Sequence, residues 1–289
     1  MRKMTRHTAR FGVVILASFV MLHAEHSTGA ATERNAADAP AASDDPAGKS
    51  ARQPSLLIIG ASSLNSPLPL TQLVSAMLAS KGIQMHIEGQ WPQLDAVTEQ
   101  LGSKRGWDYV IIDAWHLGRG PNEFGASDVP ARFPKAVGAF VKQVRAHSPN
   151  CKIILFPWWI PGRKATNEAA MEVFRRCVEQ AKRNNIWVAT TGPAFMEAAV
   201  ARSDLRITKS KADAHPGIHG AYLNACSLYT ILTGQSPVGL PATLIIKKDN
   251  GHKANYTLPP GDAHYLQKLA WKVYQREIKN TKPAKAEWR

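Results

Sequence analysis

Short apolar runs alternate with helical patterns along most of this chain, from Pro54 onward. The first run, Ser55–Ile59, ends at Gly60 and has no alternating polar positions, which is typical of a strand buried on both faces. Similar short runs predict four further strands, at residues 83–87, 108–112, 152–156 and 186–189.

The segments between these strands carry apolar residues at helical spacing. In residues 70–80, Leu73, Met77 and Leu78 share one face. Two more helices are predicted at residues 133–147 and 167–183. This alternation predicts a three-layer α/β/α domain with a mainly parallel five-stranded sheet, as in flavodoxin-like folds. Ligands bind at the carboxyl ends of such strands, so the functional loops are expected after Ile59, Ile87, Ile112 and Phe156.

The last part of the chain adds two features to this α/β core. Residues 221–232 predict another helix, and residues 264–278 predict a final one. Between them, residues 243–248 and 252–258 flank Asp249-Asn250-Gly251, which is a strong signal for a β-hairpin. The domain is therefore expected to span residues 54–279, followed by a basic tail at residues 280–289.

The amino-terminal 30 residues have the pattern of a secretory signal peptide. Arg2, Lys3, Arg6 and Arg10 precede an apolar run at residues 11–22, and small residues follow it. The run is short for a bilayer span, although an uncleaved anchor is the alternative. We therefore expect an exported protein, periplasmic or secreted, with a flexible linker at residues 31–53.

Composition and charge exclude several classes of protein. The 289 residues include 36 Lys+Arg and 22 Asp+Glu, so the formal net charge is 36 − 22 = +14. The cations are scattered and no aromatic-interleaved basic motif accompanies them, so a nucleic-acid partner is not expected. Weak attachment to an anionic envelope surface remains open. Three cysteines are too few for a disulfide-stapled scaffold.

Two segments contain the residue types of nucleophilic catalysis. Ser62 and Ser63 follow Gly60 in the first strand–helix loop, where helix N–H groups can stabilise an oxyanion. About 150 residues later, Asp213 precedes His215 by two residues, and Pro216 follows. A serine, a histidine and an acid supply a nucleophile, a base and an orienting group. Each segment alone has a plainer interpretation, as a helix-capping serine and a loop-capping acid.

A metal site is the other chemistry that this second segment suggests. Asp213, His215 and His219 are all ligand types, but no fourth ligand stands at a telling spacing. Neither a metal nor a cofactor is therefore expected.

The combined motifs resemble the SGNH (GDSL-like) hydrolase superfamily. The resemblance is to a branch whose first block reads Gly-Asn-Ser-Phe followed by Leu-Pro, matched here by residues 60–63 and 68–69. The closing block, His-Pro then Gly and Tyr-Leu, is matched by His215-Pro216, Gly220 and Tyr222-Leu223, and the helix ends in Leu-Thr-Gly at residues 232–234. The resemblance covers about residues 54–240.

The resemblance implies a role for each matching residue. Ser62 would be the nucleophile, His215 the general base and Asp213 the acid that orients the imidazole. The backbone N–H groups of Ser62 and Gly89 would bind the oxyanion. The implied activity is hydrolysis of acyl or acetyl esters, on a small-molecule ester or an acylated glycan, with no cofactor.

Two positions depart from the family pattern. The family acid stands three residues before the histidine, where this chain has Ala212. After the third strand the family supplies a neutral amide, whereas this chain has Asp113, Trp115 and His116. His116 is the candidate for a replacement donor, and Asp113, Trp115 and Trp158 are expected to line the substrate pocket. A catalytically degenerate carbohydrate-binding or envelope-associated protein on this fold is therefore the alternative.

Overall fold

The computed structural model describes residues 52–60, 64, 67–90, 106–114, 117, 129–157, 167–210, 213, 215–247 and 253–283. The chain divides into two units, Met1–Ser50 and Ala51–Arg289, and all the described residues belong to the second. The expected signal peptide at residues 1–30 lies outside the described residues, as does most of the expected linker. No helix within the described ranges has the length and apolar character needed to cross a bilayer.

The centre of the domain is a parallel five-stranded sheet with strand order β2-β1-β3-β4-β5. This confirms the predicted fold class. The chain moves outward from β1 to β2, and then crosses back to continue through β3, β4 and β5 on the other side. The topological switch point therefore lies between β1 and β3, where α/β folds place their ligands. The strands are Ser55–Ile59 (β1), His86–Gln90 (β2), Tyr109–Asp113 (β3), Lys152–Phe156 (β4) and Trp187–Val188 (β5).

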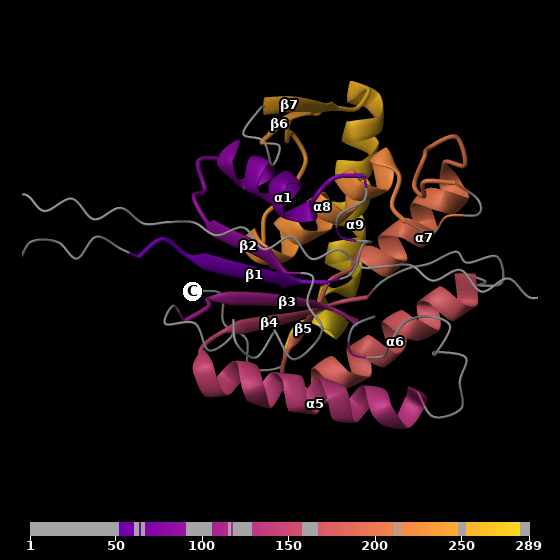
Figure 1. Ribbon diagram of the computed structural model, residues 1–289. Coiled ribbons are helices and arrows are strands. Elements are labelled where there is room, and N and C mark those ends of the chain that lie inside the picture. The colour runs from indigo at the N-terminus through magenta and orange to yellow at the C-terminus, as the bar shows by residue number, and fades with distance from the viewer. Residues whose placement is uncertain are drawn as a thin grey trace, which may run out of the picture. The chain divides into compact units, whose positions relative to one another are not determined.

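Two apolar cores cover the two faces of this sheet. Alternate residues of each buried strand point to opposite sides, so Leu56 and Ile58 join one core while Leu57 and Ile59 join the other. Helices pack on both faces, as Figure 1 shows. One face carries α1 (Leu70–Ala79), α7 (Thr191–Ala201), α8 (Ile218–Thr233) and α9 (Pro260–Thr281), and the other carries α5 (Val129–His147) and α6 (Asn167–Asn184).

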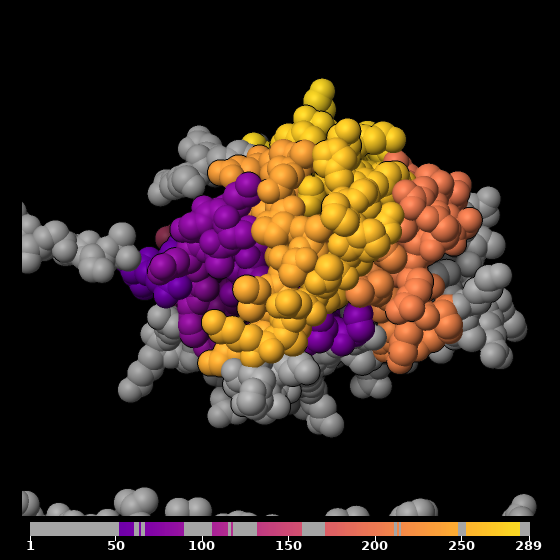
Figure 2. Space-filling view, turned by 90° about the horizontal axis from the view of Figure 1, so that it is seen from above, coloured from indigo at the N-terminus to yellow at the C-terminus, as the bar shows by residue number. Residues whose placement is uncertain are grey.

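The predicted hairpin is confirmed as an antiparallel pair, β6 (Thr243–Lys247) and β7 (Lys253–Thr257). Leu244 and Ile246 are buried while the residues between them are exposed, so one face of the hairpin packs on the core. In Figure 2, the yellow of α9 covers the middle of the molecular face above the sheet, between the purple of α1 and the salmon of α7.

Several elements differ from the sequence prediction, and α5, α8 and α9 each begin three or four residues earlier than expected. Strand β2 begins at His86 instead of Ile83, because Ile83 is still bonded through its N–H to the carbonyl of Leu78 at the end of α1. As an edge strand, β2 does not need a continuous apolar run. Helix α7 was not predicted, because it is short, alanine-rich and has no polar face that would reveal a helical period.

Helix α8 runs from the carboxyl edge of the sheet to its amino edge. The Nζ of Lys152, at the start of β4, donates to the carbonyl of Ile231 in the last turn of α8 at 2.7 Å. At the other end, an added Cβ at Gly220 would lie 3.0 Å from Phe195 of α7. Helix α7 itself begins beside the carboxyl end of β4, where Thr191 donates to the carbonyl of Pro157. Residues just before α8 are therefore placed at the carboxyl edge.

Both ends of the described domain lie at the amino edge. Arg52 precedes β1 and bonds the carbonyl of Gly106 and the carboxylate of Asp108, which precedes β3. At the other end, Lys282 lies close enough to Lys152 to contribute to its lowered pKa.

Lys152 is expected to make the stability of the domain depend on pH. Burial, assisted by Lys282, lowers the pKa of Lys152 to about 7, while the Ile231 carbonyl and the face of Trp187, 3.8 Å away, favour the charged form. A lowered folded-state pKa means that the unfolded chain binds more protons between about pH 7 and 10. Stability should therefore rise with pH across this window.

The measurement is the urea unfolding midpoint from pH 7 to 9.5 for the wild type, Lys152→Met and the exposed control Lys268→Met. The slope contributed by Lys152 should disappear in Lys152→Met and persist in the control. If the unfolding midpoint depended on pH in the same way in all three proteins, Lys152 would not be the source of the pH dependence.

Candidate active site

The carboxyl ends of β1 and β3 meet at the switch point. A Cβ added to Gly60, directly after β1, would lie 3.4 Å from the Cβ of Asp113, the last residue of β3. Asp113 is fully buried. The segment expected to carry the nucleophile therefore leaves the sheet beside a buried carboxyl group.

Asp213 and His215 form a bonded pair in the loop before α8. Oδ1 of Asp213 lies 2.6 Å from Nδ1 of His215 and also accepts the backbone N–H of His215 at 3.0 Å. These two hydrogen bonds lower the pKa of the Asp213 carboxyl, so it is ionised at neutral pH. Because an ionised carboxylate only accepts, a neutral His215 ring carries its proton on Nδ1 and has its lone pair on Nε2. Such a ring is built to receive a proton at Nε2.

The one-residue shift of the acid is accommodated by this loop. With Ala212 in the family position, the orienting contact comes from Asp213, whose backbone N–H is bonded to the carbonyl and to Oγ of Ser210. Lys209 also approaches the second oxygen of Asp213, Nζ to Oδ2, at 3.6 Å. Asp213 is thus held by the turn that precedes it.

Backbone pairing fixes the loop that carries this pair. The N–H of Lys209 donates to the carbonyl of His215 at 2.7 Å, and the N–H of Gly217 donates to the carbonyl of Ile207 at 2.9 Å. The two segments lie so close that a Cβ at Gly217 would be 2.3 Å from the carbonyl oxygen of Arg206. A Cβ at Gly220 would be 2.0 Å from the carbonyl oxygen of Ile207. The glycines of the closing block are therefore required by close backbone contact.

His219 is bonded to different partners from His215. Its Nδ1 accepts the backbone N–H of Arg206 at 3.0 Å, and its Nε2 lies 3.3 Å from Oδ2 of Asp262. His219 therefore contacts the carboxylate of Asp262, whereas His215 contacts that of Asp213. Within the described ranges, no group of three or more His, Cys, Asp or Glu side chains is arranged to hold a metal ion.

Gly89 lies within β2, opposite Ile58 of β1. A Cβ there would be 2.8 Å from Cγ2 of Thr71 in α1, so the close approach of α1 accounts for a glycine at this position. The other predicted site residues, Ser62, Trp115, His116 and Trp158, lie outside the described residues, together with Ser63 and Ala212.

The cysteines do not provide an activated nucleophile. All three are free thiols. Burial raises the pKa of Cys151 to about 12 and also raises the pKa values of Cys177 and Cys226. These thiols stay protonated at neutral pH.

Sequence reasoning missed two residues near the candidate pair. The sequence suggests His219 only as a metal ligand and gives no sign of a role for Asp262. Their contact joins residues 43 positions apart, so no local spacing could have revealed it.

Comparison with known proteins gives matches in structure alone. No protein-family model matches the chain, and no curated protein matches its sequence. A DUF4886 family protein from Bacteroides uniformis matches with a TM-score of 0.56 and 15% identity, covering 82% of this chain and 100% of the other.

Two further matches have lower TM-scores. An acetyl xylan esterase from Geobacillus stearothermophilus matches with a TM-score of 0.44 and 15% identity, over 62% of this chain and 94% of that protein. A phospholipase A1 from Streptomyces albidoflavus matches with a TM-score of 0.43 and 13% identity, over 63% and 99%. The described domain therefore shares its α/β fold with the Bacteroides uniformis protein.

Proposed function

We propose that this protein is a serine ester hydrolase with Ser62 as nucleophile, His215 as general base and Asp213 as the orienting acid. Nε2 of His215 would take the proton of the Ser62 hydroxyl while Oγ attacks the ester carbonyl carbon. The protonated imidazole would then donate to the leaving alcohol, giving an acyl-enzyme. Water, deprotonated by the same Nε2, would release the carboxylic acid and restore Ser62.

The single observation that carries this proposal is the Asp213–His215 pair at the carboxyl edge of the sheet. Its 2.6 Å contact orients a basic nitrogen, and α8, which follows it, begins at that edge. Gly60 directly follows β1 at the same edge and precedes Ser62 by two residues. An oriented imidazole and a serine at one sheet edge are the minimum that acyl transfer requires.

The oxyanion would be bound by the backbone N–H groups of Ser62 and Gly89, with His116 as a third donor. Gly89 lies within β2, opposite Ile58 of β1, and its role as a donor is carried over from the family resemblance. The ionised form of Asp113 would oppose a nearby oxyanion, which is why a compensating donor is proposed. Each lost donor of this kind typically costs about 10²–10³-fold in rate.

For the substrate, we propose acyl or acetyl esters on carbohydrate or envelope molecules. Asp113, Trp115 and Trp158 would line the pocket, with Trp158 available to stack on a sugar ring. Export through the amino-terminal signal peptide would bring the protein to such substrates.

The proposal is tested by labelling the purified protein with a fluorophosphonate, which reacts only with an activated serine. We expect stoichiometric labelling, with the adduct on Ser62 by peptide mass spectrometry. His215→Ala should abolish labelling, because Ser62 then has no base to take its proton. Labelling at Ser63, or equal labelling of His215→Ala, would contradict the assignment.

A binding protein on the same fold is favoured by one observation, the fully buried Asp113 where the resembling family has a neutral amide. If fluorophosphonate does not react and no short acyl ester is hydrolysed, while glycans still bind, this second candidate replaces the first.

A further inference from the structure

A clamp at the base of the loop carrying Asp213 and His215 connects that loop to α9. The loop leaves the core at Arg206 and returns at His219, and these two residues bond each other twice. The N–H of Arg206 donates to Nδ1 of His219 at 3.0 Å, and the N–H of His219 donates to the carbonyl of Arg206 at 3.2 Å. The ring of His219 therefore closes the loop at its base.

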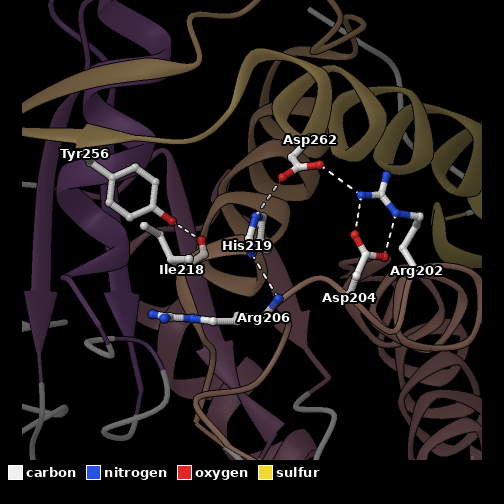
Figure 3. A network of polar contacts seen from close by, with 7 residues as sticks. All are labelled: Arg202, Asp204, Arg206, Ile218, His219, Tyr256 and Asp262. Carbon is white, nitrogen blue, oxygen red and sulfur yellow. Dashed lines mark hydrogen bonds and ion pairs between the residues drawn. The ribbon is translucent and has the colours of Figure 1, made fainter.

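The same ring is held from its other side by α9. Nε2 of His219 lies 3.3 Å from Oδ2 of Asp262, in the first turn of α9. Because Nδ1 accepts an N–H, the neutral ring carries its proton on Nε2 and donates it to Asp262. Figure 3 shows Asp262 between His219 and Arg202, with its two oxygens directed to different partners.

Arg202 completes the network from the end of α7. Its guanidinium donates to Oδ1 of Asp262 at 3.0 Å and makes two hydrogen bonds to Asp204, at 2.8 and 2.6 Å. These bonds lower the pKa of the Asp204 carboxyl. Three segments, the end of α7, the start of α8 and the start of α9, are thus joined around one carboxylate.

This network is placed to control the candidate pair without touching a substrate. His219 is largely buried, with its side chain 12% exposed, and both ring nitrogens are engaged, so it is not available as a base. His219 follows His215 by four residues. The segment after Arg206 and the segment before His219 are paired through backbone hydrogen bonds, and the bond from Lys209 to His215 is part of this pairing. Tyr256 further stabilises this end of the loop, because its hydroxyl donates to the carbonyl of Ile218, the residue before His219.

We infer that His219 is a positioning residue, which fixes the Asp213–His215 pair by clamping Arg206 to Asp262. This inference rests on the proposed function, because the pair acts as base and orienter there. Misplacing a catalytic group by about 1 Å can cost on the order of 10²-fold in rate, so a loosened clamp should lower kcat. It should leave KM nearly unchanged, since none of these residues is proposed to contact substrate.

Replacements of His219 separate its two contacts. His219→Asn keeps an acceptor near the position of Nδ1 for the N–H of Arg206 and loses the bond to Asp262. His219→Leu loses both contacts. Asp262→Asn is a milder change at the other end of the clamp, and His264→Leu, an exposed residue of α9, is the matched control.

The expected order of kcat for a short acyl ester is wild type and His264→Leu, then His219→Asn, then His219→Leu, with about a tenfold to hundredfold loss in the last. KM should change by less than about threefold, as expected when transition-state stabilisation alone is lost. Rates are expressed per serine titrated with fluorophosphonate, so that unfolded protein is not counted. If His219 only filled space, kcat of His219→Asn would not be higher than kcat of His219→Leu.

Amide hydrogen exchange provides a readout that does not depend on activity. Exchange at Arg206, Lys209 and Gly217 should be faster in His219→Leu than in the wild type and partly protected in His219→Asn, with α5 and α6 unchanged. Unchanged exchange at these amides, or equal kcat in all variants, would overturn the clamp. If the wild type hydrolyses no ester, the proposed function fails while the exchange measurement still decides whether the clamp exists.

Discussion

Replacing either Ser62 or His215 by alanine should reduce ester hydrolysis by about 10⁴-fold or more, because nucleophile and base act as one unit. The double variant should be no slower than the slower single variant, since removing one member already disables the other. The measurement is kcat on a chromogenic acetyl ester, with circular dichroism to confirm folding.

Two matched controls accompany these variants. Ser63→Ala removes the neighbouring hydroxyl, and His264→Ala removes an exposed histidine on α9. Both should retain kcat within about threefold of the wild type, as expected for positions outside the proposed chemistry. A larger loss in Ser63→Ala than in Ser62→Ala would move the nucleophile by one residue.

Asp213→Asn should lower kcat by about 10²–10⁴-fold while His215 remains in place. The asparagine amide can donate to Nδ1, which would favour the tautomer with its proton on Nε2 and remove the basic lone pair. It also removes the negative charge that stabilises the imidazolium formed during acylation. The measurement is kcat across pH 5 to 9 in the wild type and the variant.

Lys209→Gln is the control for this change, because its Nζ lies 3.6 Å from the second oxygen of Asp213 and is itself exposed. An exposed ion pair contributes little, so the expected change in kcat is below about threefold. Wild-type turnover in Asp213→Asn would remove this carboxylate from the mechanism.

Most of the fold could be predicted because its buried strands are apolar over their whole length. Leu56 to Ile59 and Ile153 to Phe156 are almost completely buried, as their uninterrupted apolar runs predicted. The same rule failed for β2, since a strand at the edge of a sheet is buried on fewer sides and tolerates His86 and Glu88. It also failed for α7, where Ala194 and Ala198 pack closely without forming an amphipathic pattern.

The candidate site was predictable only where its residues are neighbours in sequence. Asp213 and His215 are two residues apart, and their spacing allows the contact that the structure has. The closing glycines could be recognised from the motif, although their reason, the passage of residues 206–208 directly over them, is a tertiary contact. Asp262 could not be anticipated, because its bond to His219 depends on how α9 crosses the start of α8.

Both ends of the described domain lie at the sheet edge opposite the Asp213–His215 pair, and this arrangement suits experiments that attach the protein to something else. Arg52 at one end and Lys282 at the other are close to the starts of β3 and β4, on the far side from the loop before α8. A fluorescent protein, an affinity tag or a surface linker fused at either end of the described domain would leave the sheet edge with the Asp213–His215 pair open to bulky ligands. Immobilised preparations coupled at either end of the described domain are therefore suitable for testing the proposed substrates, including polymeric ones.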